Sequence, residues 1–171
     1  KFEQGSADEL NVRVDDRLCE MERFGQKNGK GYYRYEAGSR QALRDEDVEA
    51  LVISTSIDAG FERRSISDNE IVERCLLGLI NEGARILQEG IASSSADIDK
   101  VYLNGYGFPA ERGGPMAYAD ERGIANVYNA LKALEAEHGE FFKPAALLQR
   151  LAEQQCCFAD VNSSDINTES K

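Results

Sequence analysis

The stretch Gly105–Met116, which reads GYGFPAERGGPM, decides between two folds for this chain. Its first half has the G-x-G-x-x-A spacing of a dinucleotide-binding loop, which needs a strand before the glycines and a helix N-terminus directly after them. Its second half contains Gly113-Gly114-Pro115, and proline is favoured in the first turn of a helix. The choice between a dinucleotide-binding loop and a structural connection to a helix determines whether the chain carries a cofactor site of its own.

The residues around this stretch favour a structural elbow between helices. Ser94 and Asp97 have the spacing of a helix N-terminus, and the apolar residues after them follow a helical period. Pro109 removes a backbone N–H from the middle of the phosphate cradle and disfavours helical backbone at Phe108. The acidic residue that should follow about 20 positions later is missing, because Leu131 and its amphipathic surroundings lie there. We therefore predict a helix–proline elbow.

Composition narrows the class of protein. The 171 residues, 42% hydrophobic and 30% charged, are typical of a soluble globular chain with one core or two small ones. The net charge of −11 argues against binding to a nucleic-acid backbone, and no apolar run approaches the roughly 18 residues of a membrane span. The start, Lys1-Phe2-Glu3-Gln4, has no initiator Met and no apolar signal core, so we expect a processed or excised piece of a longer chain.

The four cysteines indicate a reducing compartment. Cys19 and Cys75 lie in apolar helical patterns and are expected to be buried as small hydrophobic residues. Cys156 and Cys157 are expected at a loosely packed helix end. No C-x-x-C pair exists and His138 is the single histidine, so the sequence predicts no metal site.

Apolar periodicity predicts an all-α fold of about six helices with one short extended segment. The predicted helices span residues 7–21, 68–89, 116–121, 124–138 and 144–154, and a short one ends near Asn104. The tyrosines after the Asn28-Gly29 turn alternate as an extended segment would, and residues 36–47 are predicted to form a loop. Residues 48–53 fit either a short helix or an edge segment. No parallel-sheet pattern is present.

The helix predicted at 68–89 is the clearest element. Ser67 and Glu70 form a capping-box pattern at its start, and Gly90 ends it. Its apolar residues form a stripe wide enough to face a core. The stripe comprises Ile71, Val72, Cys75, Leu76, Leu79, Ile80 and Leu87. Gly83 costs about 1 kcal/mol relative to alanine inside a helix, which predicts the close approach of another backbone there.

Several motifs occur in a familiar order along the chain. They are RFGQKNGKGYY at 23–33, EIVERCL at 70–76, NEGA at 81–84, EGI at 89–91, DID at 97–99 and the elbow at 106–116. Together they resemble the C-terminal region of 3-hydroxyacyl-CoA dehydrogenases. The resemblance covers about Leu10 to Gln154. It is greatest to the multifunctional β-oxidation enzymes, which fuse an enoyl-CoA hydratase to such a dehydrogenase and carry two copies of a helical repeat.

The resemblance implies a division of the chain and of the chemistry. Residues 1–64 would be the end of the first helical repeat and a linker, 65–155 the second repeat, and 156–171 a disordered polar tail. Family members oxidise (3S)-3-hydroxyacyl-CoA to 3-ketoacyl-CoA with NAD. The His–Glu pair and the glycine-rich loop that do this belong to an N-terminal Rossmann domain, and no residue here matches them, His138 included. We therefore assign no catalytic, cofactor-binding or metal residue, and expect the isolated chain to be inactive.

The resemblance also implies partners. The second repeat packs on the first and supports the acyl-CoA cleft from behind, so the Rossmann domain and first repeat of the parent enzyme are the expected partners. With part of the first repeat missing, we expect exposed apolar surface and self-association. A free-standing, non-catalytic helical scaffold or dimerisation module is the alternative. A bacterial parent would be cytoplasmic; alternatively it is peroxisomal, since Ser170-Lys171 lies one residue short of a Ser-Lys-Leu signal.

Basic residues form one local cluster: Lys27, Lys30 and Arg34. Beside glycines, Lys27 and Lys30 are placed to contact CoA phosphates, or they belong to a solvated turn whose long side chains lie along the surface. The glycines do not open a helix, which favours the solvated turn. His138 closes a predicted helix, where the helix dipole favours a histidine, and no partner for catalysis accompanies it.

Overall fold

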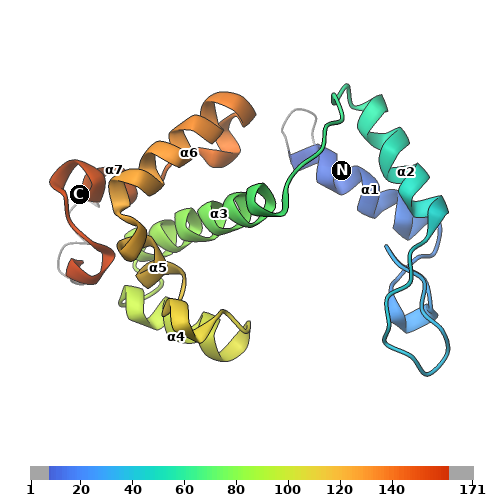
Figure 1. The fold of residues 1–171 in the computed structure, drawn as a ribbon, viewed down its shortest axis with the longest axis horizontal. Coiled ribbons are helices and arrows are strands. Elements are labelled where there is room, and N and C mark those ends of the chain that lie inside the picture. The colour runs from blue at the N-terminus through green and yellow to red at the C-terminus, as the bar shows by residue number, and fades with distance from the viewer. Residues whose placement is uncertain (1–7, 162–171) are drawn as a thin grey trace. The chain divides into compact units, whose positions relative to one another are not determined.

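The structure, a computed structural model, describes residues 8–161. Those residues form seven α-helices and four short 3₁₀ helices, with no strand among them, which confirms the all-α prediction (Figure 1). The chain divides into two compact units, residues 1–65 and 66–171, called unit 1 and unit 2 below. The assignment of these units to a first and a second helical repeat stays a prediction.

Unit 1 contains α1 (Asp8–Glu20), the 3₁₀ helix η1 (Gln26–Asn28) and α2 (Glu46–Asp58). Arg17 joins the two helices, because its guanidinium donates to Thr55 Oγ1 at 3.1 Å and lies 3.4 Å from Asp58 Oδ2. The segment at 48–53, for which the sequence left two alternatives, is therefore part of a helix.

The predicted short extended segment with the tyrosines lies in a loop. Residues 25–43 of this loop fold back on themselves through isolated antiparallel bridges, which join Gly25 to Lys30, Lys30 to Arg34 and Arg34 to Leu43. The physical reason is a crossing of two glycines: a Cβ on Gly31 would lie 2.7 Å from the Cα of Gly25, so the backbone passes over itself where a side chain would prevent it.

Unit 2 is built around α3 (Asp68–Gln88), and the remaining elements follow in chain order. They are α4 (Ser95–Gly105), η2 (Ala110–Arg112), α5 (Pro115–Arg122), α6 (Ile124–His138), η3 (Glu140–Phe142), α7 (Ala146–Gln154) and η4 (Phe158–Asp160). Ser67 Oγ accepts the N–H of Glu70 at 3.2 Å and so starts α3 as predicted. Ser94 caps α4 in the same way through the N–H of Asp97, at 3.3 Å. Helices α5 and α7 pack against α3, and α6 packs against α7.

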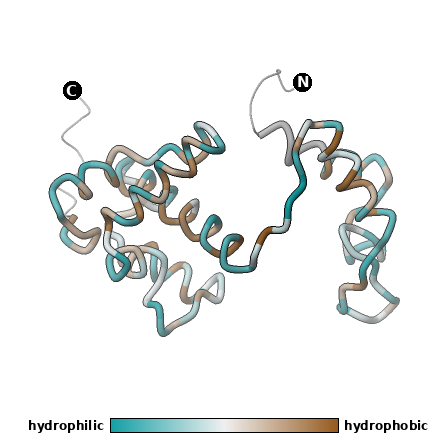
Figure 2. The backbone as a smooth tube through the Cα atoms, turned by 45° about the horizontal axis from the view of Figure 1, so that its top comes forward, coloured by the Kyte–Doolittle hydropathy of each residue, from teal (hydrophilic) through white to brown (hydrophobic). Residues whose placement is uncertain are grey.

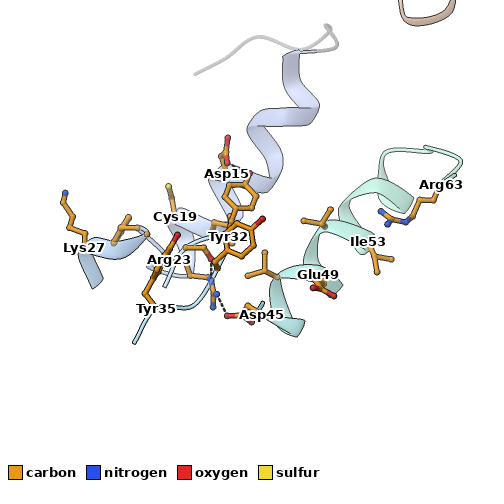
Figure 3. Close-up of a pocket in the computed structure, with 17 residues that line it drawn as sticks. Asp15, Cys19, Arg23, Lys27, Tyr32, Tyr35, Asp45, Glu49, Ile53 and Arg63 are labelled. Carbon is orange, nitrogen blue, oxygen red and sulfur yellow. Dashed lines mark hydrogen bonds and ion pairs between the residues drawn. The ribbon is translucent and has the colours of Figure 1, made fainter. Parts of the chain in front are cut away.

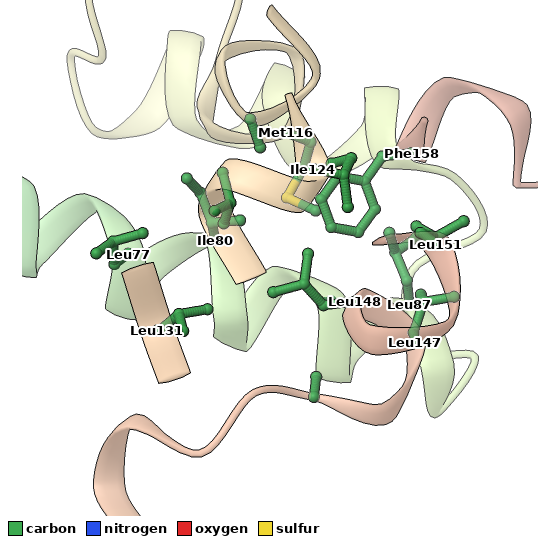
Figure 4. Packing of buried hydrophobic residues seen from close by; sticks show 14 of the residues in the cluster. Leu77, Ile80, Leu87, Met116, Ile124, Leu131, Leu147, Leu148, Leu151 and Phe158 are labelled. Atoms are coloured by element: carbon green, nitrogen blue, oxygen red, sulfur yellow. The ribbon is translucent and has the colours of Figure 1, made fainter. Parts of the chain in front are cut away.

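The core of unit 2 covers only the second half of α3. Leu77, Ile80, Ala84 and Leu87 are buried there, among side chains of α5, α6, α7 and η4 (Figure 4). Helices α5 and α6 reach the first half of α3 through the ion pairs Arg122–Glu73 and Glu137–Arg74, whereas the first half of the predicted stripe is exposed. Its exposed members are Ile71, Val72 and Cys75. Brown and teal alternate along the helices of Figure 2, as expected for amphipathic elements.

Gly83 packs against a side chain, and the predicted backbone approach is wrong. A Cβ on Gly83 would lie 2.5 Å from Sδ of Met116, which is fully buried. The thioether of α5 therefore fills the space that glycine leaves on α3.

Two further expectations need correction. Cys19 and Cys75 are exposed, because the helix faces that carry them are not covered by the described residues. The tail predicted to be disordered from 156 begins with η4, whose Phe158 is fully buried; the N–H groups of Phe158 and Ala159 donate to the carboxylate of Asp120 at 2.8 and 3.1 Å. The other tail residues, 162–171, lie outside the described part of the chain, as do Lys1 to Gln4.

Within residues 8–161, no helix combines the length and the apolar character needed to cross a bilayer.

Candidate functional site: the groove of unit 1

A groove of about 1240 Å³ lies in unit 1 between α1, α2 and the loop that joins them. Its lining is mainly apolar and aromatic; Lys27 and Arg63 lie at opposite sides of it, and Arg23 lies next to Tyr32 (Figure 3). The apolar and aromatic lining residues are Leu18, Phe24, Tyr32, Tyr33, Tyr35, Val48, Val52 and Ile53. Leu18 and Val48 are buried, whereas Phe24, Tyr33 and Ile53 are exposed. The groove is therefore a hollow whose walls remain open to solvent.

Tyr32 is held across the groove by a hydrogen bond. Its hydroxyl donates to Oδ1 of Asp15 on α1, and the two side chains face each other in Figure 3. Partial burial, together with the neighbouring carboxylate, raises the pKa of Tyr32 to about 12. The phenol therefore stays protonated at neutral pH and acts as a donor, not as a base.

A buried ion pair forms the wall beside α2. Arg23 donates from Nη2 to Oδ2 of Asp45 and from Nε to the carbonyl of Gly31 at 2.9 Å. Asp45 also caps α2 by accepting the N–H of Asp47 at 3.2 Å. The guanidinium of Arg23 holds the pKa of Asp45 below its ordinary value. The pair joins the glycine-rich loop to the start of α2 and keeps one side of the groove in place.

The three basic residues of the predicted cluster separate in the structure. Lys27 lines the groove, whereas Lys30 and Arg34 border a second hollow of about 770 Å³. Lys30 Nζ donates to the carbonyl of Met21 at 3.4 Å, and Arg34 donates to the carbonyl of Arg44 at 3.3 Å. The structure therefore does not bring them together into one cationic pocket, and a contact between Lys27 or Lys30 and CoA phosphates stays a prediction.

The elbow in unit 2 is confirmed as a structural connection. The segment before it is helix α4, and Pro115 is the first residue of α5. The carboxylate of Asp99 accepts the N–H groups of Met116 at 2.7 Å and Ala117 at 3.1 Å. The first two N–H groups of α5 are therefore bonded within the protein. Burial of the carboxyl group raises the pKa of Asp99.

His138 lies at the end of α6, 3.3 Å from a carboxylate oxygen of Glu137 and with its ring 5.9 Å from that of Phe142. The expectation that His138 has no catalytic role stays a prediction. The described residues hold no cluster of three metal-ligating side chains.

Comparison with known proteins gives the class. Residues 71–157 match the family model described as the C-terminal domain of 3-hydroxyacyl-CoA dehydrogenase, which covers the elbow and most of unit 2. The chain belongs to this family. The resemblance stated from the sequence is thereby confirmed.

Individual relatives are longer proteins. The chain is 42% identical over 144 residues to the peroxisomal bifunctional enzyme of Danio rerio, which aligns with 81% of this chain. It is 34% identical to the fatty acid oxidation complex subunit alpha of a Shewanella species, over 84% of this chain. In each comparison the chain spans about 20% of the relative's length.

A solved structure shares the fold. The dehydrogenase part of multifunctional enzyme 1 from C. elegans superposes with a TM-score of 0.61 at 24% identity. The superposition covers 80% of this chain and 32% of that structure.

Proposed function

We propose that this chain is the C-terminal part of the NAD-dependent (3S)-3-hydroxyacyl-CoA dehydrogenase portion of a fatty-acid β-oxidation enzyme that also carries a hydratase. The observation that supports this most is the family match at residues 71–157, together with relatives that are named as bifunctional enzymes. In this proposal the chain supplies packing surface to the catalytic unit, and the chemistry takes place in the rest of the protein.

The chain's own residues support a role without chemistry. The stretch that imitates a dinucleotide loop begins at the end of helix α4 and not after a strand, and the first N–H groups of α5 bond to Asp99. In the proposed whole protein, NAD binds to a Rossmann domain that precedes this chain. The acyl-CoA lies in a cleft between that domain and the first helical repeat, with unit 2 behind it.

We propose a peroxisomal location for the whole protein. The support is that the relatives at 42% identity, from Danio rerio and Homo sapiens, are named as peroxisomal enzymes, whereas the Shewanella relative shares 34%. A cytoplasmic bacterial parent is the alternative. Imaging of the fluorescently tagged whole protein in its own cells distinguishes the two.

The isolated chain is expected to associate with itself. Apolar side chains are exposed on α2 and on the first half of α3, including Ile57 at 62%, Ile71 at 50% and Val72 at 55%. Such surfaces favour contact with a further protein surface. Sedimentation velocity over a wide concentration range should show a rising average mass; a constant monomer mass would contradict this expectation.

The decisive experiment measures dehydrogenase activity in the reverse direction. The isolated chain, mixed with NADH and acetoacetyl-CoA, should consume no NADH above the buffer rate. The whole protein, which includes the preceding domains, should oxidise NADH with the same substrate. Turnover by the 171-residue chain would refute the proposal that its chemistry lies elsewhere, and an inactive whole protein would refute the proposed activity.

A further inference from the structure

Two Asn-Gly pairs occur in this chain, Asn28-Gly29 in unit 1 and Asn104-Gly105 in unit 2. An asparagine before glycine is prone to spontaneous deamidation, because the glycine has no side chain that hinders the approach of its backbone nitrogen. Both asparagines are exposed, so water reaches them. The function proposed above uses neither pair.

Deamidation at such a pair needs no reagent except water. The glycine nitrogen attacks Cγ of the asparagine and a C–N bond forms. The side-chain NH₂ takes up the proton of the glycine N–H and leaves as ammonia, which closes a cyclic succinimide. Water then opens one of the two carbonyl groups of the ring. The product is an aspartate or an isoaspartyl linkage, in which the side-chain carbon becomes part of the backbone.

The fold directs the Asn28 side chain toward the preceding residues and not toward Gly29. Its Oδ1 accepts the N–H of Phe24 at 3.2 Å, and its Nδ2 donates to the carbonyl of Glu22 at 2.6 Å. The N–H of Gly29 donates to the carbonyl of Gln26 at 3.3 Å. The succinimide therefore closes only after these bonds break and Asn28 leaves the helical conformation of η1.

The bonds around Asn28 lie in a weakly supported part of the molecule. The 3₁₀ helix η1 has three residues, and the buried apolar side chains among the described residues of unit 1 are Leu18 and Val48. Asn104 instead lies in the eleven-residue helix α4, which packs against α5 and buries Ile98 in the core of unit 2. Local opening costs least where few apolar contacts are buried. Asn28 should therefore reach the reactive conformation more often than Asn104.

The deamidated loop differs from the closed loop in hydrogen bonding and in length. A carboxylate has no hydrogen to donate, so an aspartate at position 28 places an oxygen where Nδ2 of Asn28 donates to the carbonyl of Glu22. An isoaspartyl linkage lengthens the backbone between Gly25 and Gly31. These glycines cross so closely that a Cβ on Gly31 would lie 2.7 Å from the Cα of Gly25. Either product weakens the loop between α1 and α2.

We propose that Asn28-Gly29 is a site of spontaneous deamidation, that local opening of the loop controls its rate, and that the deamidated loop no longer closes fully. The loss of ammonia makes the modification permanent. The modified fraction therefore records how long the loop has spent open. Asn104-Gly105 serves as an internal control, because the same pair of residues occurs there in a better supported element.

Mass spectrometry compares the two sites in one molecule. The 171-residue chain is incubated in heavy-oxygen water at mildly alkaline pH, with and without urea, and its peptides are analysed for the heavy oxygen. In the native chain we expect Asn28 to deamidate about tenfold faster than Asn104 or more. In urea the two rates should agree within about threefold, since only the local sequence then differs. Equal native rates would overturn the proposal, as would a rate at Asn28 that urea does not increase.

A variant tests whether opening of the loop controls the rate. Asp45→Asn removes the ion pair through which Arg23 ties the loop to α2, while an asparagine still caps that helix. We expect deamidation at Asn28 to become about threefold faster or more, with no change at Asn104. An unchanged rate at Asn28 would contradict the proposed control by the loop.

The effect of the product is measured by amide hydrogen exchange. The N–H of Gly25 donates to the carbonyl of Lys30 at 2.8 Å and closes the loop. Its exchange should be about fivefold faster in Asn28→Asp, which imitates one product, and unchanged in the matched control Asn104→Asp. The amides of unit 2 report that each variant is folded. The same exchange rate at Gly25 in Asn28→Asp and in the unmodified chain would overturn the claim that the product disturbs the loop.

Discussion

The carboxyl group of Asp99 occupies the position that a side chain on Gly114 would need. A Cβ on Gly114 would lie 2.5 Å from both Cβ and Cγ of Asp99, and the backbone of Gly114 has φ of +110°. Only glycine combines this φ with this lack of volume. The contact allows the carboxylate to reach the first amides of α5, so one glycine makes the cap of the elbow possible.

Gly114→Ala should destabilise unit 2 by about 2–4 kcal/mol, because it adds backbone strain and displaces the Asp99 cap. Gly105→Ala is the matched control: Gly105 ends α4, and a Cβ there meets nothing within 4 Å. Urea unfolding followed by circular dichroism measures both variants. A Gly114→Ala protein as stable as the control would contradict the role of this contact.

Two glycines of α3 should respond to alanine in opposite directions. Gly78 has open space around it, so Gly78→Ala should stabilise the helix by about 0.5–1 kcal/mol. At Gly83 the same gain is opposed by the buried Met116, and overpacking costs about 1–3 kcal/mol, so Gly83→Ala should destabilise the protein by about 1 kcal/mol. Thermal or urea unfolding of both variants shows whether each substitution raises or lowers the free energy of unfolding. The pairing with Met116 is disproved if Gly83→Ala is the more stable of the two.

Phe158→Ala should lower the free energy of unfolding of unit 2 by about 3–5 kcal/mol, since the side chain is fully buried. Ile91→Ala, at a side chain that is 72% exposed, should change it by less than about 0.5 kcal/mol. Urea titration distinguishes the two. Equal, small effects would mean that residues 156–161 do not belong to the folded unit.

Lowering the pH should decrease the stability of unit 1 through Asp45 and increase the stability of unit 2 through Asp99 and Asp120. In unit 1 the folded pKa of Asp45 is below its ordinary 3.8, so its stabilisation is present above about pH 3.8 and is lost as the pH falls through the folded value. In unit 2, burial raises the pKa of Asp99 and Asp120. The stabilisation that these raised pKa values give unit 2 is therefore fully present below about pH 3.8 and is lost as the pH rises through the folded pKa values.

The measurement is urea unfolding at several pH values, followed by NMR signals of each unit. Asp45→Asn should flatten the acid limb of unit 1 while leaving the pH dependence of unit 2 unchanged. Asp99→Asn should reduce the loss of unit 2 stability as the pH rises above about 3.8. An unchanged acid limb in Asp45→Asn would exclude the Arg23–Asp45 pair as its source.

The features that depend on residues close to one another in the sequence could be predicted from the sequence. The starts of α3 and α4 depend on Ser67 and Ser94, each of which bonds to an amide three residues later, so the sequence shows both directly. The elbow was also readable, because Pro109 and Pro115 restrict their own backbone. The family resemblance rested on these same local motifs.

Contacts between residues that are far apart in the sequence could not be predicted in this way. The stripe of α3 predicted a buried face, but periodicity does not say which half of a helix other elements cover, so the exposure of Cys75 was missed. The folding back of the tyrosine loop was not predicted because the crossing of Gly25 and Gly31 leaves no periodic signal. The groove itself depends on Arg23 bonding to Asp45, 22 residues away. Asp45, followed by Glu46, Asp47 and Glu49, was the available sign that a helix starts there.

The segment from Gly60 to Asn69 is exposed at every residue, and it contains Arg63 and Arg64. Trypsin should therefore cut the native chain there before it reaches the helices of unit 2. The C-terminal product would keep every residue of its core, whereas the N-terminal product would depend on two buried apolar side chains. A brief digestion therefore separates the unit with the larger apolar core from the unit with the smaller one.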